Sequence, residues 1–589
     1  MGFIRVKKLI GIIASLQLKI YHLNNFVIDG RMLPIMDWKV MQKSFTVPNV
    51  IINRRRRIHR KWHLPGIRLQ FSGLRLISLV IVVLVLLPLA YLGIRAMGAG
   101  AEGLDYLTAK RTIRIMTNSL WLVIAVTVSA AAIGIPFAWL TSRTDLPLRR
   151  VWLILGLLAM VIPSYLAAVA YLAAFGPVGI VQSWLEPLFG IKRLPDIHGF
   201  FGAWLAITLF TYPYVMLPVR AAFLNTDPGL EEAGQSLGLN RWQVFWRITF
   251  PQLRPAMAGG MLLAAMYALS DFGAVAIMRY NAFTRAIYEA QRGFRAERAA
   301  LLALALVVFT LLLLAIEWRS NSGKANYRIG IGASRKAKTV KLGIWKIPAV
   351  IFCFLIVLIS VFLPVSVMAY WTFSGIGQAS PIDLNMPQLV VNTTSVSALT
   401  AFVAAIVAMP LALLAVRNKS RFNNTLVSLA YTGNVLPGIV IALALVYFAA
   451  RYTTSIYQTV PLLILGYATR FLPFSIGATR SALTQVNPKL EEVAHSLGLS
   501  RWQVIWRVTI PLAKTGILGG AALIFLGVMK ELPTTLILRP IGFETFSTRI
   551  WSFYNEAFLP QIGLPGFMLM GVSALGLILI LWHDKQTTS

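Results

Sequence analysis

Carboxylates interrupt two apolar stretches of this sequence. Asp271 lies within "MLLAAMYALSDFGAVAIM", and Glu531 lies within "ALIFLGVMKELPTTLIL". A carboxylate inside a membrane is costly, so it faces a cavity, binds a cation or pairs with a base. Glu531 has Lys530 and Arg539 nearby as possible partners, and Asp271 has Arg279. The two acids therefore indicate either a translocation pathway that suits a hard cation or a pair of structural ion pairs.

A polar stretch occurs twice. Residues 230–251 are "LEEAGQSLGLNRWQVFWRITFP", and residues 490–511, 260 positions later, are "LEEVAHSLGLSRWQVIWRVTIP". Asp-Pro or Asn-Pro before each copy predicts a capped helix start, with the glutamates at its positive end. The glycine predicts a left-handed helix end, and Asn240 or Ser500 then caps a second short helix, which the proline ends or bends. The repeated residues are Glu231, Glu232, Gly238, Pro251, Glu491, Glu492, Gly498 and Pro511.

The composition indicates the setting of these residues. Of 589 residues, 57% are hydrophobic and only 13% are charged, against about 25% charged in soluble domains. Continuous apolar runs in lipid must be helices, because only a helix satisfies its own backbone. The sequence predicts an all-α polytopic membrane protein with about twelve spans. They are expected near 73–96, 118–141, 151–175, 200–223, 256–278, 299–317, 347–372, 393–416, 426–450, 459–477, 515–538 and 564–582.

Lysine and arginine set the expected orientation, because they concentrate in cytoplasmic loops. Residues 1–72 hold fourteen of them against two acids, which predicts a basic cytoplasmic N-terminal arm on a lipid surface rather than on nucleic acid. Residues 318–346 hold eight and are expected to be a cytoplasmic linker. Residues 279–298 hold five arginines yet fall outside in this arrangement, which is an exception.

The repeat predicts two homologous halves of six helices each, residues 73–317 and 347–585. An even number of spans gives both halves the same orientation, so both polar loops should lie on the cytoplasmic side. Paired membrane repeats are typical of transporters. The tryptophans fit two roles, helices that lie on the membrane surface or docking sites for a cytoplasmic partner. The repeated glutamates and glycines favour docking, and two docking sites favour a dimeric partner.

The loops resemble the hallmark loop of ABC importer permeases of the type I fold. The resemblance rests on Glu232-Ala233-Gly234 with Gly238, and on Glu492-Val493-Ala494 with Gly498, each followed by proline. It implies that both loops are coupling helices that dock on a dimer of ATP-binding subunits. It also implies an inner-membrane location and an external substrate-binding protein as partner.

Several stretches, "SDFGAVAIMRYNAFTRAIY" and "KELPTTLILRPIGFETFSTRIW" among them, are similar to the iron(III) branch of that family. The resemblance therefore implies ferric iron as cargo, with thiamine, sulfate or a polyamine as alternatives. An ion-driven secondary transporter is a less favoured alternative. The chain has no phosphate-binding loop, so we expect no ATPase activity of its own and no cofactor. Its six histidines are scattered, and no metal site is expected.

Overall fold

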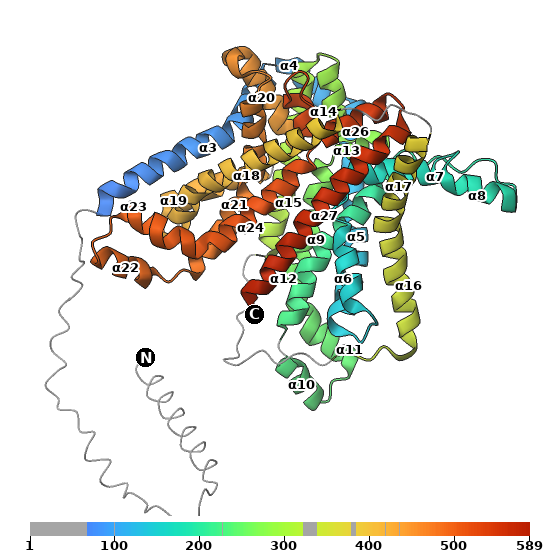
Figure 1. The fold of residues 1–589 in the computed structure, drawn as a ribbon, viewed down its shortest axis with the longest axis horizontal. Coiled ribbons are helices and arrows are strands. Elements are labelled where there is room, and N and C mark those ends of the chain that lie inside the picture. Colours follow the sequence, from blue (N-terminus) through green and yellow to red (C-terminus); the bar gives the residue numbers. More distant parts are fainter. Residues whose placement is uncertain are drawn as a thin grey trace, which may run out of the picture. The chain divides into compact units, whose positions relative to one another are not determined.

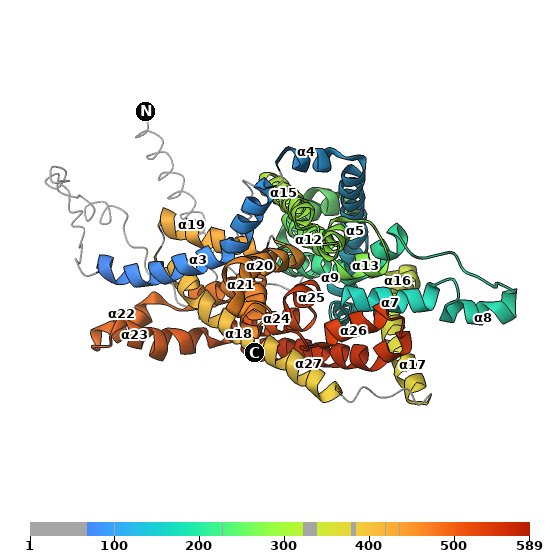
Figure 2. The same cartoon turned by 90° about the horizontal axis from the view of Figure 1, so that it is seen from above.

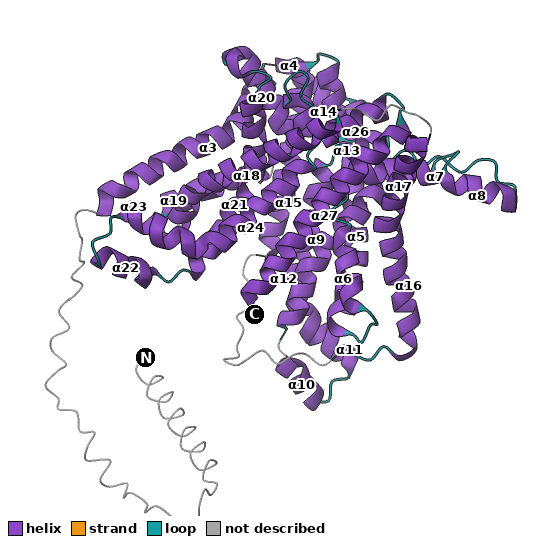
Figure 3. Ribbon diagram, viewed as in Figure 1, coloured by secondary structure: helices purple, strands orange, loops and turns teal. Residues whose placement is uncertain are grey.

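The computed structural model describes residues 67–98, 100–226, 228–321, 339–377, 385–418, 420–434 and 436–588. Most of the predicted N-terminal arm, the centre of the linker and Asp227 lie outside these ranges. Residues Arg68–Ser589 form one compact unit. Figure 3 shows that the described part consists of helices and loops, with one isolated β-bridge between Thr144 and Val340. The predicted all-α class is confirmed.

Each predicted span coincides with a helix or with a pair of helices. In the first half these are α3 (Ile67–Met97), α5 (Lys110–Arg143), α6 (Arg149–Leu158) with α7 (Ser164–Phe175), α9 (Phe200–Asn225), α12 (Phe250–Ser270) and α15 (Ala296–Asn321). In the second half they are α16 (Lys346–Val357) with α17 (Leu363–Gly377), α18 (Met386–Arg417), α19 (Arg421–Ala430) with α20 (Gly438–Tyr452), α21 (Val460–Gln485), α24 (Ile510–Met529) and α27 (Gly563–Thr588).

Not every predicted span is long and apolar enough to cross a membrane. Within the described ranges, nine helices meet that requirement, or ten if the bent pair α19 and α20 is one span. Helices α12 and α27 form where spans were predicted but do not meet it over their described residues. All twelve predicted spans thus correspond to helical segments, but within the described ranges only nine or ten segments meet the requirement of length and hydropathy.

Three helices pack together at the centre of each half. They are α5, α9 and α12 in the first half and α18, α21 and α24 in the second. Glycines allow the close approach: a Cβ atom added to Gly260 would lie 2.8 Å from the backbone of Val215. At the repeat-related Gly520, an added Cβ atom would lie 3.0 Å from the Cβ atom of Ala478 on α21. Small residues at such contacts are the usual means of helix association in lipid.

The first helix of each half packs on the other half, as Figures 1 and 2 show. On α3, the ring of Tyr91 meets those of Phe448 and Tyr452 on α20 at 5.9 and 6.0 Å between centroids. In return, the segment from α16 to α17 packs on the first half, where the Tyr171 hydroxyl donates to the carbonyl of Ile359 at 3.1 Å. The two halves are thus interlocked.

The third and fifth spans of each half are broken, although the sequence predicted them as continuous. In the third spans the chain leaves the helix before Pro163 and Pro437, and α19 and α20 meet at 97°. Proline lacks a backbone N–H and disfavours helical geometry in the residue before it. In the fifth spans, α12 stops before Asp271 and is followed by α13 (Gly273–Ile277), and α24 is followed beyond Glu531 by α25 (Pro533–Leu538).

Candidate functional site

The repeated loops, residues 228–251 and 488–511, have the same structure. The first contains α10 (Pro228–Ser236), α11 (Arg241–Val244) and the π-helical turn η1 (Phe245–Thr249), which continues into α12. The second contains α22 (Pro488–Ser496), α23 (Arg501–Val504) and η6 (Ile505–Thr509), which continues into α24. In Figure 1, α10 and α22 lie at the lower ends of the helices, whereas α14 (Phe283–Arg292) and α20 lie at the upper ends.

The backbone of each loop follows the predicted caps. Gly238 and Gly498 both have φ of +86°, the left-handed region that glycine adopts without steric cost. The Asn487 side chain accepts a hydrogen bond from the N–H of Lys489 at 3.0 Å and caps α22. Ser500 and Gln503 form a reciprocal capping box at the start of α23. The two-helix form of the loops is therefore confirmed.

The prolines play a different local role from the one predicted. Pro251 and Pro511 do not end the second short helix, because the chain passes through η1 or η6 directly into α12 or α24. Both prolines stand in the first turn of the long helix. A missing N–H is tolerated there, since the first turn of a helix lacks intrahelical acceptors in any case. Each loop is thus continuous with a central helix of its half.

The first glutamate of each loop is anchored inside the chain. Arg143, at the end of α5, contacts Glu231 at 2.8 Å, and the Thr249 hydroxyl donates to the same oxygen at 3.0 Å. Arg417, at the end of α18, contacts Glu491 at 2.9 Å, and Thr509 repeats the hydroxyl contact at 3.0 Å. These bonds tie each loop to two central helices, and charge-assisted bonds of this kind are among the stronger ones.

The outer surface of each loop is exposed and partly apolar. Leu237 and Leu497, next to the left-handed glycines, are 83% and 79% exposed. The side chains of Trp242 and Trp502 are exposed as well, as are the second glutamates, Glu232 and Glu492. Apolar and aromatic side chains gathered on a short helix that projects from the molecule are typical of a protein-docking surface.

Asp271 lies in the gap between α12 and α13 and is buried. Its carboxylate accepts hydrogen bonds from the hydroxyl of Ser164 at the start of α7 and from the backbone N–H of Ala274 at 2.9 Å. Ser164 in turn accepts a bond from the Tyr267 hydroxyl at 3.1 Å. Asp271 therefore joins the beginnings of two helices, and Arg279, the partner considered from the sequence, does not pair with it in the described part of the chain.

Glu531 has the equivalent place in the second half but a different partner. The guanidinium of Arg470 on α21 donates to its carboxylate, and Thr534 donates its hydroxyl at 2.7 Å. Neither Lys530 nor Arg539 is the observed partner. The space for Arg470 exists because Gly438 has no side chain, since a Cβ atom there would lie 1.9 Å from the guanidinium.

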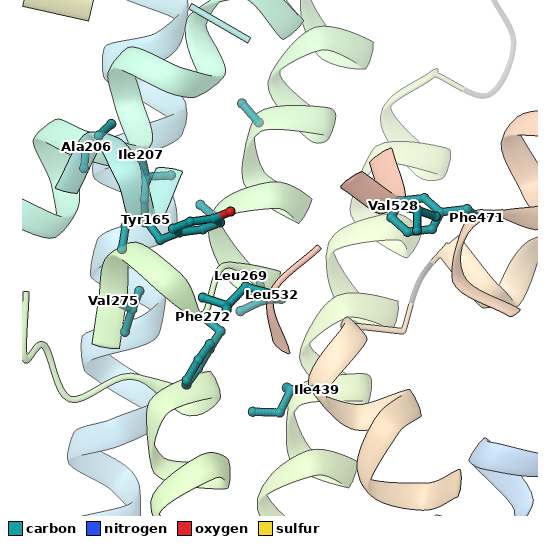
Figure 4. Close-up of a cluster of buried hydrophobic side chains, with 14 of the residues drawn as sticks. Tyr165, Ala206, Ile207, Leu269, Phe272, Val275, Ile439, Phe471, Val528 and Leu532 are labelled. Carbon is teal, nitrogen blue, oxygen red and sulfur yellow. The ribbon is translucent and has the colours of Figure 1, made fainter. Parts of the chain in front are cut away.

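Apolar residues next to these two acids in the chain belong to a buried cluster that both halves share. Figure 4 shows Tyr165, Leu269 and Phe272 of the first half together with Ile439 and Leu532 of the second, and all belong to one buried hydrophobic cluster. In the same region the Tyr165 hydroxyl donates to Ser547 across the halves at 2.9 Å. Both breaks thus lie at the contact between the halves, because the Phe272 ring meets that of Trp551 at 5.2 Å between centroids and the Lys530 ammonium donates to the Met160 carbonyl.

Comparison with known proteins decides the family. The model of the family described as binding-protein-dependent transport system inner membrane component matches residues 134–317 and again residues 404–585. The chain belongs to this family of ABC importer permeases. The two matches also confirm the prediction that the permease consists of two related halves.

Three relatives illustrate the range of similar permeases. The Fe(3+)-transport system permease protein FbpB 2 of Haemophilus influenzae is 30% identical over 476 residues, which cover 80% of this chain and 90% of the relative. The ferric transport system permease protein FbpB of Actinobacillus pleuropneumoniae is 25% identical, over 75% of this chain and 66% of the relative. The sulfate transport system permease protein CysW of Escherichia coli is 27% identical, over 37% and 71%.

The linker of the permease is fastened beside the first loop. The backbone of Val340 pairs with residues 143–145, and its N–H donates to the carbonyl of Arg143 at 2.7 Å. Asp145 accepts a bond from the N–H of Leu342 at 2.8 Å and pairs with Lys346 at 2.9 Å. The hydrogen bond from Lys346 is the main cause that lowers the pKa of the Asp145 carboxyl. No local pattern in the sequence signals this contact, because Asp145 and Leu342 are 197 residues apart.

Proposed function

We propose that this permease carries ferric iron into the cytoplasm, using ATP that a separate dimeric subunit hydrolyses. An external substrate-binding protein delivers the cargo. The proposal rests mainly on the two repeated loops. They have the same backbone conformation at their glycines, the same arginine–glutamate contact to the central helices, and similarly exposed leucines at their tips. Ferric iron as cargo is supported by the relative that matches the chain over most of its length, which is a Fe(3+)-transport permease.

The loops can transmit motion because each is rigidly joined to two central helices. The π turn makes each loop continuous with α12 or α24, and the arginine anchor ties it to α5 or α18. A displacement of a docked ATP-binding subunit would therefore move whole helices rather than a flexible tip. Because the two loops match, a symmetric dimer would move both halves together. We assign docking to the exposed tips around Gly238 and Gly498, and the holding of the loops to Glu231 and Glu491.

The arrangement in the membrane belongs to the same proposal. The loops, the N-terminal arm of residues 1–72 and the linker of residues 318–346 face the cytoplasm, and the halves comprise residues 73–317 and 347–585. The cargo passes between the halves, near Asp271 and Glu531. Their position at the contact of the two halves, in breaks of equivalent helices, supports this path.

The test is transport in proteoliposomes that hold the permease with its own ATP-binding subunit and binding protein. Leu237→Asp combined with Leu497→Asp places two charges in the docking surface. We expect ATP-driven uptake of radiolabelled ferric iron in the wild type and its loss in this variant. Ile541→Asp is the matched control, because Ile541 is 87% exposed but lies outside both loops.

The possible outcomes separate the parts of the proposal. Uptake that survives the double variant would contradict the docking role of the loops. A wild type that moves sulfate but not iron would keep the importer and replace the cargo, in line with the similarity to a sulfate permease. Equal loss of uptake in the Ile541 variant would show that the assay reports general damage.

A further inference from the structure

We infer that Lys530 and Arg470 form an anion-binding site between the halves, so that the cargo crosses as an oxyanion complex of the metal rather than as a bare cation. This inference rests on the proposed function and specifies the chemical form of its cargo. The site consists of Lys530 at the end of α24, Arg470 on α21, and the ring cluster of Phe210, Tyr214 and Tyr267, of which Phe210 faces Lys530.

Lys530 reaches from the second half into the first. Its ammonium donates a hydrogen bond to the carbonyl of Met160 at 2.8 Å, in the gap between α6 and α7. The helix break there leaves carbonyls without their usual helical donors. The same ammonium lies 6.0 Å from the centre of the Phe210 ring on α9. Lys530 is thus a cation of one half that is held by a neutral carbonyl and a ring face of the other.

No carboxylate compensates this cation. Among the residues that the structure describes, Lys530 forms no salt bridge, since the adjacent Glu531 pairs with Arg470 instead. The two nearby acids are already engaged, Asp271 by Ser164 and backbone N–H groups, and Glu531 by Arg470 and Thr534. Charges in a membrane protein interior are normally paired or face a path for ions, so a half-buried ammonium without a carboxylate partner indicates an anionic ligand.

The repeat shows that this site is asymmetric. The two acids are equivalent under the 260-residue offset, but their surroundings are not, because the positions equivalent to Lys530 and Arg470 are Ser270 and Phe210. The Phe210 ring, which the Lys530 ammonium faces, lies 4.5 Å from the ring centre of Tyr267 and 6.0 Å from that of Tyr214. Both cations therefore come from the second half, whereas the first half presents aromatic faces and hydroxyls. One substrate site between the halves needs no symmetry, which fits this difference.

The site offers mainly hydrogen-bond donors. The Lys530 ammonium and the guanidinium N–H groups of Arg470 that Glu531 does not accept offer donors to oxygen acceptors, and arginine and lysine are the usual ligands of phosphate and carboxylate. A bare ferric ion would meet the ammonium of Lys530 and a glutamate that Arg470 already occupies. A ferric ion bound to phosphate, carbonate or a polycarboxylate would present the oxygens that these donors recognise.

The test measures whether an anion enters with the metal. Proteoliposomes with the complete transporter are supplied with radiolabelled ferric iron and, in parallel runs, with labelled phosphate, carbonate or citrate. We expect one of the anions to enter with iron, only when ATP is present. Lys530→Gln keeps a donor for the Met160 carbonyl but removes the charge, and we expect it to slow iron uptake about ten- to a hundredfold. Lys530→Arg keeps the charge, and we expect it to retain most of the activity.

Each result decides between specific alternatives. Iron that enters with none of the three anions, or a Lys530→Gln variant that transports like wild type, would overturn the anion site. Melting curves of both variants in detergent exclude a folding defect as the reason for slow uptake. A wild type that moves sulfate without iron would refute ferric cargo alone, and the same two variants would then test the site with sulfate.

Discussion

The left-handed glycines of the two loops permit a quantitative prediction. Gly238 and Gly498 have φ of +86°, and a Cβ atom added at either would meet no atom within 4 Å. Alanine would therefore fit sterically but would be strained in its backbone. The cost of a left-handed conformation for a residue with a Cβ atom is about 1–2 kcal/mol. The double variant Gly238→Ala with Gly498→Ala should thus lose about 2–4 kcal/mol across the two loops.

This free energy acts on the docking conformation. Because 1.4 kcal/mol corresponds to a factor of ten in an equilibrium constant, the ratio of the form with both loops native to the other forms should fall on the order of 30- to 800-fold. The assay is the affinity of the permease in lipid nanodiscs for its ATP-binding subunit, measured by surface plasmon resonance, together with ATP-driven uptake. We expect weaker binding and lower uptake, with little change in the melting of the transmembrane helices.

A second pair of glycines provides the control. Gly259 and Gly519 are also related by the repeat and also have no atom within 4 Å of an added Cβ atom, but they lie inside α12 and α24 without positive φ. Alanine there should be neutral or should stabilise the helix by about 0.5–1 kcal/mol. Equal losses in the two double variants, or unchanged binding in the first, would refute the argument that backbone conformation at the loop tips governs docking.

Three further changes test other contacts. Glu491→Gln removes the charge that Arg417 binds and should destabilise the second loop by about 1–3 kcal/mol, visible as faster hydrogen exchange in residues 488–511. Asp145→Asn should loosen the linker at neutral pH. Because the pKa of Asp145 is lowered in the folded state, this contribution is complete above the ordinary aspartate value of about 3.9 and is lost only as the pH falls through the lowered one. The difference in melting temperature from wild type should therefore be constant from about pH 5 to 8. Gly438→Ala should displace the guanidinium on α21 and lower the melting temperature, whereas Gly477→Ala, whose nearest contact would be 3.7 Å away, should not.

The sequence predicted the repeated loops well because their rules are local. Capping residues and the left-handed glycine act within a few residues of themselves, and each pattern occurs twice. The prolines were the exception, because they stand in the first turn of the long helices instead of ending the short ones. The helical class was equally accessible, because apolar length alone decides it in lipid. The breaks before Asp271 and Glu531 were not predicted, since a hydropathy run is insensitive to a helix that stops and restarts within it.

The partners of the buried acids could not be found in this way. Arg470 is 61 residues from Glu531, and Ser164 is 107 residues from Asp271, so neither pair leaves a local pattern. Arg470 did carry one signal, namely a charge within an apolar span. Comparison of the halves would have added a second signal for the Arg470–Glu531 pair. Ser164 and Gly438 both begin a helix directly after a proline, and the glycine leaves room for the arginine side chain where the first half has a serine.

The exchange of first helices has a consequence for how the protein is made. Arg75 on α3 donates to the Asn423 side chain at 3.2 Å, across 348 residues of sequence. At a synthesis rate of about 5–20 residues per second, α3 leaves the ribosome roughly 20–70 s before its partner exists. During that time its polar and aromatic groups must be accommodated by lipid, the insertion machinery or a chaperone. The last stages of folding therefore wait for the second half, and a chain truncated at the linker would remain with its first helix unpaired.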